Sequence, residues 1–139
     1  MERTEFISKG LSDTWDIGDY IGRHAKKGEM YLLKGELGAG KTQLVKGIAR
    51  GLGVKEWQYV VSPSFTLMNI YEGADFDLCH VDLYRIEDME IEDLQIEEFL
   101  DSGIVVVEWS DKRQWDNDAV KIEIYVTGEE ERNIVVIRP

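Results

Sequence analysis

Residues 30–52 read MYLLKGELGAGKTQLVKGIARGL, an apolar run followed by glycines and then by a longer amphipathic segment. Residues 30–35 begin with the apolar run MYLL, which is typical of a short strand buried on both faces. From residue 41 to residue 52 the apolar side chains recur at helical spacing, and Gly53 is a suitable stop for a helix. The stretch therefore predicts a strand, a glycine-rich loop and a helix in direct succession.

The loop matches the phosphate-binding pattern G-x-x-x-x-G-K-[ST] through Gly35, Gly40, Lys41 and Thr42. Glycines allow a tight turn that brings backbone N–H groups against phosphate oxygens, and the following helix directs its positive end toward them. Lys41 supplies a charge for the β and γ phosphates, and the Thr42 hydroxyl is suited to hold Mg²⁺. A glycine turn that merely enters a helix is the alternative, and the flanking strand and helix favour nucleotide binding.

Phosphoryl chemistry also needs an acid near the metal, and such acids usually follow neighbouring strands of the sheet. Glu108 follows the apolar run IVVV, and Asp82 follows the run CHV. Residues 62–67, SPSFTL, are a third candidate, in which we expect Thr66 to reach the metal or the γ phosphate. Solvated strand ends and an ordinary turn before a strand are the alternatives for these features.

The remaining segments complete an alternating pattern of helices and strands. Residues 11–26 carry apolar side chains at helical spacing, and residues 89–100 form an acidic amphipathic stretch. Alternation within residues 122–126 and 134–137 predicts a C-terminal hairpin. Further strands are expected at residues 59–61, 66–71, 78–83 and 104–109. We therefore predict an α/β fold with a mostly parallel central sheet, flanking helices and a C-terminal antiparallel hairpin.

Length and charge narrow the possible functions. A chain of 139 residues fits one domain, 1–139, without room for a separate substrate domain. Lys and Arg number 16 against 28 Asp and Glu, a net charge of −12 that disfavours direct binding to nucleic acid or anionic membranes. Cys79 is the single cysteine, and the N-terminal residues lack the apolar core of a signal peptide. These features predict a cytoplasmic protein without a membrane partner.

Four motifs together carry a family resemblance. The segments GELGAGKT, SPSFTL, HVDLYR and VVEWSDK, in this order and at these separations, are similar to those of the TsaE (formerly YjeE) family. TsaE proteins are small P-loop ATPases of tRNA threonylcarbamoyladenosine (t6A) synthesis. The resemblance therefore implies a P-loop NTPase-like fold and the cofactors ATP and Mg²⁺. It covers about residues 11–112, and the four motifs are far more specific than the first alone.

The resemblance also implies roles for individual residues. Thr42 and Glu108 are implied to bind Mg²⁺, and Lys41 and Asp82 to support hydrolysis together with Glu108. Thr66 is implied to act as a switch residue that senses the γ phosphate. The residues implied to wrap the ATP phosphates are Leu37, Gly38, Ala39, Gly40, Lys41 and Thr42.

Three further positions lie at the margins of this implied site. Leu11 is implied to approach the adenine from the first predicted helix. Trp109 is either an aromatic beside the nucleotide or a core residue. Gln43 stands where the family commonly has a second threonine, which leaves one hydroxyl fewer near the phosphates.

In the TsaE family the ATPase acts on a complex of the TsaB and TsaD proteins. That complex transfers a threonylcarbamoyl group to adenosine 37 of tRNAs that read codons beginning with A (ANN codons). The resemblance implies a Mg²⁺-dependent ATPase that is weak alone and resets this complex, with tRNA contacted only indirectly. The acidic residues 87–98 are a candidate partner-facing surface, and a solvated helix face is the alternative.

Other functions use the same loop. A small-molecule kinase usually has a lid with several arginines, whereas the arginines of this chain are isolated. A GTPase is expected to carry Asn-Lys-x-Asp and Asp-x-x-Gly motifs after the loop, and the sequence has neither there. A non-catalytic ATP sensor would bind the nucleotide as an assembly signal. The kinase and the sensor are therefore the alternatives to a partner-dependent ATPase.

Overall fold

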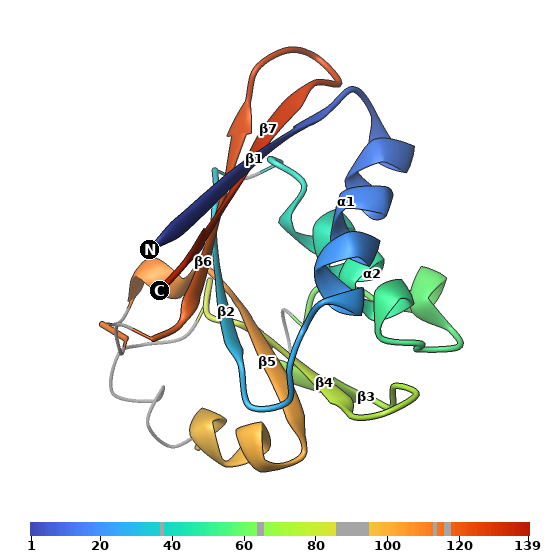
Figure 1. The fold of residues 1–139 in the computed structure, drawn as a ribbon, viewed down its shortest axis with the longest axis vertical. Coiled ribbons are helices and arrows are strands. Elements are labelled where there is room, and N and C mark those ends of the chain that lie inside the picture. Colours follow the sequence, from blue (N-terminus) through green and yellow to red (C-terminus); the bar gives the residue numbers. More distant parts are fainter. Residues whose placement is uncertain (37, 64–65, 86–94, 113, 116–117) are drawn as a thin grey trace.

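The computed structural model describes residues 1–36, 38–63, 66–85, 95–112, 114–115 and 118–139. In this part of the chain, seven strands form one sheet in the order β1-β7-β6-β2-β5-β4-β3 (Figure 1). The strands are β1 (Glu2–Ser8), β2 (Met30–Lys34), β3 (Met68–Tyr71), β4 (Asp77–Asp82), β5 (Gly103–Glu108), β6 (Val120–Val126) and β7 (Arg132–Arg138). The α-helices are α1 (Leu11–Arg23) and α2 (Lys41–Gly51). Within the described ranges, no helix combines the length and apolar character needed to cross a membrane.

The centre of the sheet is parallel. β2, which precedes the glycine-rich loop, pairs in parallel with β5 and with β6, and β5 pairs in parallel with β4. β3 pairs antiparallel with β4, β7 with β6, and β1 with β7. The predicted fold class, with its parallel centre, flanking helices and C-terminal hairpin, is confirmed. Because parallel strands point their carboxyl ends to one edge, the residues that end β2, β4 and β5 lie together.

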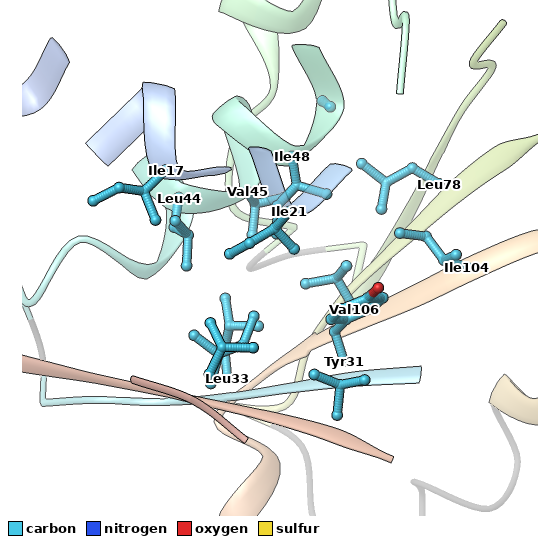
Figure 2. Close-up of a cluster of buried hydrophobic side chains, with 14 of the residues drawn as sticks. Ile17, Ile21, Tyr31, Leu33, Leu44, Val45, Ile48, Leu78, Ile104 and Val106 are labelled. Carbon is cyan, nitrogen blue, oxygen red and sulfur yellow. The ribbon is translucent and has the colours of Figure 1, made fainter. Parts of the chain in front are cut away.

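The larger core lies between the sheet and the two α-helices, which cover one face (Figure 1). Leu44, Val45 and Ile48 of α2 lie above Leu33 and Val106 of the sheet (Figure 2). All five side chains are fully buried. Burial of one aliphatic side chain stabilises the fold by about 1.5–3 kcal/mol. This packing therefore holds α2, and the loop that leads into it, against β2 and β5.

α1 and α2 pack with their backbones in close contact. A Cβ atom added at Gly18 of α1 would lie 2.5 Å from the backbone oxygen of Leu44. One added at Gly47 of α2 would lie 2.4 Å from the backbone oxygen of Trp15. Trp15 Nε1 also donates a hydrogen bond to Gln43 Oε1 at 3.0 Å, in the first turn of α2. α1 thus fixes the position of α2 beside the loop.

A smaller apolar cluster lies on the other face of the sheet. Leu32, Val105 and Val107 contribute from the strands, and Ile96 packs there from the 3-10 helix η3 (Ile96–Asp101). β5 is therefore covered on both faces, which explains its continuous apolar run. Residues 89–94 of the predicted acidic stretch 89–100, and residues 87–94 of the candidate acidic surface 87–98, lie outside the described residues.

Two expectations about strands need correction. The strand predicted over residues 59–61 is wrong, because Trp57–Tyr59 form the 3-10 helix η1 and Tyr59 is 76% exposed. β1 was missing from the predicted elements, because most of its side chains are exposed and its sequence has no alternating apolar pattern. Its pairing with β7, near the other end of the chain, supplies the hydrogen bonds that local pattern does not predict.

Candidate nucleotide-binding site

The glycine-rich loop joins the end of β2 to the start of α2. Gly38 and Gly40 have φ angles of 82° and 103°, in the left-handed region that favours glycine. Arg132, at the start of β7, supports the loop because its Nε donates a hydrogen bond to the Ala39 backbone oxygen at 3.0 Å. Leu37, which was predicted to wrap the phosphates, lies outside the described residues. The loop therefore turns at two positions where other residues would be strained.

Lys41 begins α2 and folds back over the loop. Its Nζ donates hydrogen bonds to the backbone oxygens of Gly35 (2.6 Å) and Glu36 (3.0 Å) and lies 3.9 Å from the centroid of the Trp109 ring. Burial lowers the pKa of the Lys41 ammonium, and the Glu108 carboxylate acts in the opposite direction. The ammonium is thus held by neutral carbonyl groups and an aromatic face, which are weaker partners than a phosphate oxygen.

Thr42 and Glu108, which were predicted to share a metal ion, are in direct contact. Thr42 Oγ1 donates to the Glu108 carboxylate, with distances of 3.0 Å to Oε2 and 3.2 Å to Oε1. Glu108 ends β5 and lies two residues beyond Val106, so its side chain is on the sheet face that α2 covers. Only 3% of Glu108 is exposed. A buried carboxylate therefore lies directly beside the first turn of α2.

Asp82 ends β4 and is paired in register with Glu108 on β5. Both acids consequently lie at the same edge of the sheet and on the same face. One carboxylate oxygen of Asp82 accepts a hydrogen bond from the Tyr84 backbone N–H at 2.9 Å, and the other accepts one from the Ser62 hydroxyl. Asp82 is therefore fixed in orientation by hydrogen bonds from two separate segments of the chain.

Within the segment SPSFTL, Ser62 contacts the acid Asp82, a contact that was not among the predictions. The Thr66 hydroxyl donates to Asn69 Oδ1 at 3.0 Å. The role of Thr66 toward the metal or the γ phosphate stays a prediction. Ser62 was not singled out, although its position before a proline in a turn was a usable signal.

His80 is a second residue that sequence reasoning missed. It lies within β4 and is fully buried, and its Nε2 is 2.5 Å from Glu108 Oε2. A histidine inside the otherwise apolar run LCHV was the available signal. Its contact with Glu108 depends on the register between β4 and β5, which the sequence alone does not reveal.

A cleft of about 510 Å³ opens at the first turn of α2. It brings together six of the predicted site residues, which are Gly38, Gly40, Lys41, Thr42, Asp82 and Glu108. The lining residues are Gly38, Gly40, Lys41, Thr42, Gln43, Ser62, Asp82, Tyr84, Arg85, Glu108 and Trp109. Leu11, at the start of α1, is 49% exposed and does not belong to this lining. The adenine role predicted for Leu11 stays a prediction.

Trp109 packs partly against the smaller core and also lines the cleft, and its place beside the nucleotide stays a prediction. Its ring contacts Lys41 and packs 4.8 Å from the Tyr84 ring. Its φ angle of 58° is unusual for a large side chain and turns the backbone sharply after β5. The aromatic ring is thereby placed beside the loop.

The donor groups of the cleft fit a hard cation that binds together with a nucleotide. Among the described residues, no three His, Cys, Asp or Glu side chains are grouped as a metal site. Mg²⁺, however, usually binds through one or two carboxylates plus substrate phosphates. Thr42 and Glu108 offer a hydroxyl and a carboxylate beside the phosphate-binding loop, which is a suitable donor set for that ion.

The model of the TsaE family, described as threonylcarbamoyl adenosine biosynthesis protein TsaE, matches residues 8–134. The tRNA threonylcarbamoyladenosine biosynthesis protein TsaE of Aquifex aeolicus (strain VF5) is 38% identical over 134 residues, 96% of each chain. The protein of the same name from Treponema pallidum (strain Nichols) is 35% identical over 135 residues, 94% of this chain and 97% of the relative.

A crystal structure of Bacillus subtilis YdiB has the same fold. The TM-score is 0.80 with 30% sequence identity, and the match covers 99% of this chain and 86% of the other. The family match spans the loop, both acids, β6 and the first three residues of β7, so it includes every residue that lines the cleft. The chain therefore belongs to the TsaE family.

Proposed function

We propose that the chain is a Mg²⁺-dependent ATPase that acts in forming the threonylcarbamoyl group on adenosine 37 of tRNAs reading ANN codons. Membership of the TsaE family supports the pathway. The observation that carries the chemistry is the convergence of Lys41, Thr42, Asp82 and Glu108 on one cleft at the start of α2. A phosphate-binding loop, a hydroxyl and two buried acids are the groups that phosphoryl transfer to water requires.

In this proposal the loop binds the ATP phosphates. Residues 37–42 supply backbone N–H groups, and the start of α2 adds the positive end of its dipole. Lys41 Nζ exchanges the backbone oxygens of Gly35 and Glu36 for the β and γ phosphates, because contacts between charged groups are the stronger ones. Leu11 is proposed to contact the adenine from the start of α1.

Thr42 and Glu108 are proposed to hold Mg²⁺ together with the nucleotide. Bound there, the ion would supply positive charge to the β and γ phosphate oxygens as charge develops on them. Asp82 is proposed to orient the attacking water and accept its proton. Its carboxylate already accepts two hydrogen bonds, but it offers about four lone-pair sites and so retains room for a water.

The hydrogen bond from Ser62 to Asp82 suggests how nucleotide state reaches the surface. Residues 62–67 are joined to the proposed water-orienting acid through this contact. We propose that Thr66 in the same segment responds to the γ phosphate, so that loss of the phosphate changes the surface presented to a partner.

We propose the TsaB and TsaD proteins as partners, in the cytoplasm, with tRNA contacted only through them. The net charge of −12 supports indirect contact, because binding to a nucleic acid gains affinity by releasing counterions from neutralised phosphates. The test is co-elution with TsaB and TsaD in ATP, in ADP and without nucleotide. Equal co-elution in all three states would argue against the switch. Submicromolar binding of tRNA by the isolated chain would argue against the proposal that tRNA is contacted only through the partners.

The ATP site is tested by isothermal titration of Lys41→Ala with MgATP. A hydrogen bond to a charged group contributes about 1.5–3 kcal/mol, so we expect affinity to fall by about one to two orders of magnitude. Unchanged affinity would mean that the loop is a structural turn. Phosphate release with and without TsaB and TsaD then separates an ATPase from a nucleotide sensor, and phosphate transfer to an added acceptor would identify a kinase.

A further inference from the structure

His80 is a buried polar residue without an assigned role. The side chain is fully buried, and its Nε2 lies 2.5 Å from Glu108 Oε2. Its other ring nitrogen, Nδ1, has no hydrogen-bond partner within the described part of the chain. Burying a polar atom without a partner costs free energy, so an apolar residue would serve packing alone better. The contact with Glu108 is therefore the feature that distinguishes histidine at this position.

The two donors that approach Glu108 are distributed unequally over its carboxylate. Oε2 lies 2.5 Å from His80 Nε2 and 3.0 Å from Thr42 Oγ1, whereas Oε1 has the longer Thr42 distance of 3.2 Å. A carboxylate oxygen accepts hydrogen bonds, so a hydrogen on Nε2 of the ring would account for this contact. Oε1 retains more of its capacity to bind a cation.

We propose that His80 is a positioning residue, which holds Oε2 of Glu108 so that Oε1 is presented, beside the Thr42 hydroxyl, to the cation that accompanies the nucleotide. This inference rests on the proposed function, in which Thr42 and Glu108 share that cation. A glutamate side chain that is already fixed loses less conformational freedom when the cation binds. Partners that orient metal ligands in this way typically contribute about 10- to 100-fold to metal affinity.

The first experiment compares nucleotide binding at graded Mg²⁺ concentrations and in EDTA. Isothermal titration with a non-hydrolysable ATP analogue is run on the full chain, on His80→Leu and on His80→Gln. Leu78→Val is a matched control, because Leu78 is a buried residue of the same strand and packs in the larger core. Thermal unfolding of each variant confirms that it is folded.

Mg²⁺ should raise the affinity for the nucleotide analogue, and the Mg²⁺ concentration at the midpoint of this rise should be about 10- to 100-fold higher for His80→Leu than for the unmodified chain. The affinity in EDTA should be unchanged. The amide nitrogen of Gln takes a place similar to that of Nε2, so His80→Gln should restore most of the effect. Leu78→Val should behave as the unmodified chain. An unaltered Mg²⁺ requirement in His80→Leu, or an equal loss of affinity in EDTA, would overturn the proposal.

A second measurement on the unmodified chain does not depend on the folding of a variant. Long-range ¹H–¹⁵N NMR spectra of the imidazole should show the hydrogen of His80 on Nε2, with Nδ1 bare. A hydrogen on Nδ1 alone would overturn the proposal. If nucleotide binding by the unmodified chain is itself independent of Mg²⁺, the proposed function fails as well. If that binding depends on Mg²⁺ and His80→Leu leaves the dependence unchanged, only the role of His80 is overturned.

Discussion

The first turn of α2 is polar, whereas the middle of the helix packs through an apolar side chain and a glycine. The first turn carries Lys41 and Thr42, a buried ammonium and a hydroxyl whose partners are loop carbonyls and the Glu108 carboxylate. The middle carries Gly47, whose backbone lies against α1, and Ile48, which is fully buried. Removing a charge from water is costly, so the first turn contributes little to stability, whereas apolar packing contributes much. We therefore expect changes near the first turn to affect ATP, and changes in the middle to affect folding.

The largest effect is expected at Asp82, which lines the same cleft as that first turn. Asp82→Asn should slow phosphate release by about 10²- to 10⁴-fold, because the amide cannot accept the proton of the attacking water. The affinity for MgATP, measured in parallel by titration, should stay nearly intact. A full-rate Asp82→Asn protein would remove Asp82 from the proposed mechanism.

A smaller effect is expected when Glu108 loses its charge. Glu108→Gln keeps the size of the side chain but removes the charge of a proposed metal ligand, so the gain in ATP affinity from Mg²⁺ should shrink by at least the roughly 10- to 100-fold that loss of an outer-shell partner costs. Titrations with MgATP, and with ATP in EDTA, measure this gain directly. The EDTA value serves as the control and should match that of the unmodified chain. A full Mg²⁺ gain in Glu108→Gln would place the cation elsewhere.

The middle of α2 should respond in the opposite way. The added Cβ of Gly47→Ala would lie 2.4 Å from the Trp15 backbone oxygen. The shifts of backbone and side chains that such overpacking forces typically lower the free energy of unfolding by about 1–3 kcal/mol. Urea denaturation measures this loss. At low temperature, MgATP affinity per folded molecule should change little. A loss of affinity as large as the loss of stability would break the distinction between the two parts of α2.

Gly10→Ala is the matched control for this substitution. No atom lies within 4 Å of the position that its Cβ would take. Gly10 is the N-cap of α1, where alanine is a poorer residue than glycine, so the free energy of unfolding should fall by about 0.5–1 kcal/mol, less than for Gly47→Ala. Equal destabilisation by the two glycine substitutions would show that close helix packing is not the cause.

The smallest effect is expected on the opposite face of the sheet. Cys79 in β4 is 2% exposed, and burial raises the pKa of its thiol to about 12. At pH 8 the reactive thiolate is then a fraction on the order of 10⁻⁴. Alkylation by iodoacetamide should be barely detectable in the folded chain and complete in denaturant. Rapid alkylation of the folded chain would show that β4, which also carries Asp82, opens locally.

Local patterns were sufficient to predict the unit formed by β2, the loop and α2. Glycine spacing and helical periodicity depend on residues close in sequence, and both acids could be placed because parallel strands end at one edge. The roles of His80 and Ser62 could not be predicted in this way. The contact of His80 depends on the register of β4 against β5, and that of Ser62 on the path of a loop. β1 was missed for a related reason, since its partner lies far along the chain.

The pairing of β1 with β7 also has a consequence for synthesis on the ribosome. β2, β4 and β5 emerge before β7, so the strands that end in the two acids can pair while β1 still lacks its neighbour. Contacts between distant parts of a chain form slowly, because a long loop must close first. Arg132, which supports the glycine-rich loop through Ala39, belongs to the same late strand. We therefore expect a nascent chain to assemble its acidic edge early and to gain the support of its phosphate-binding loop last.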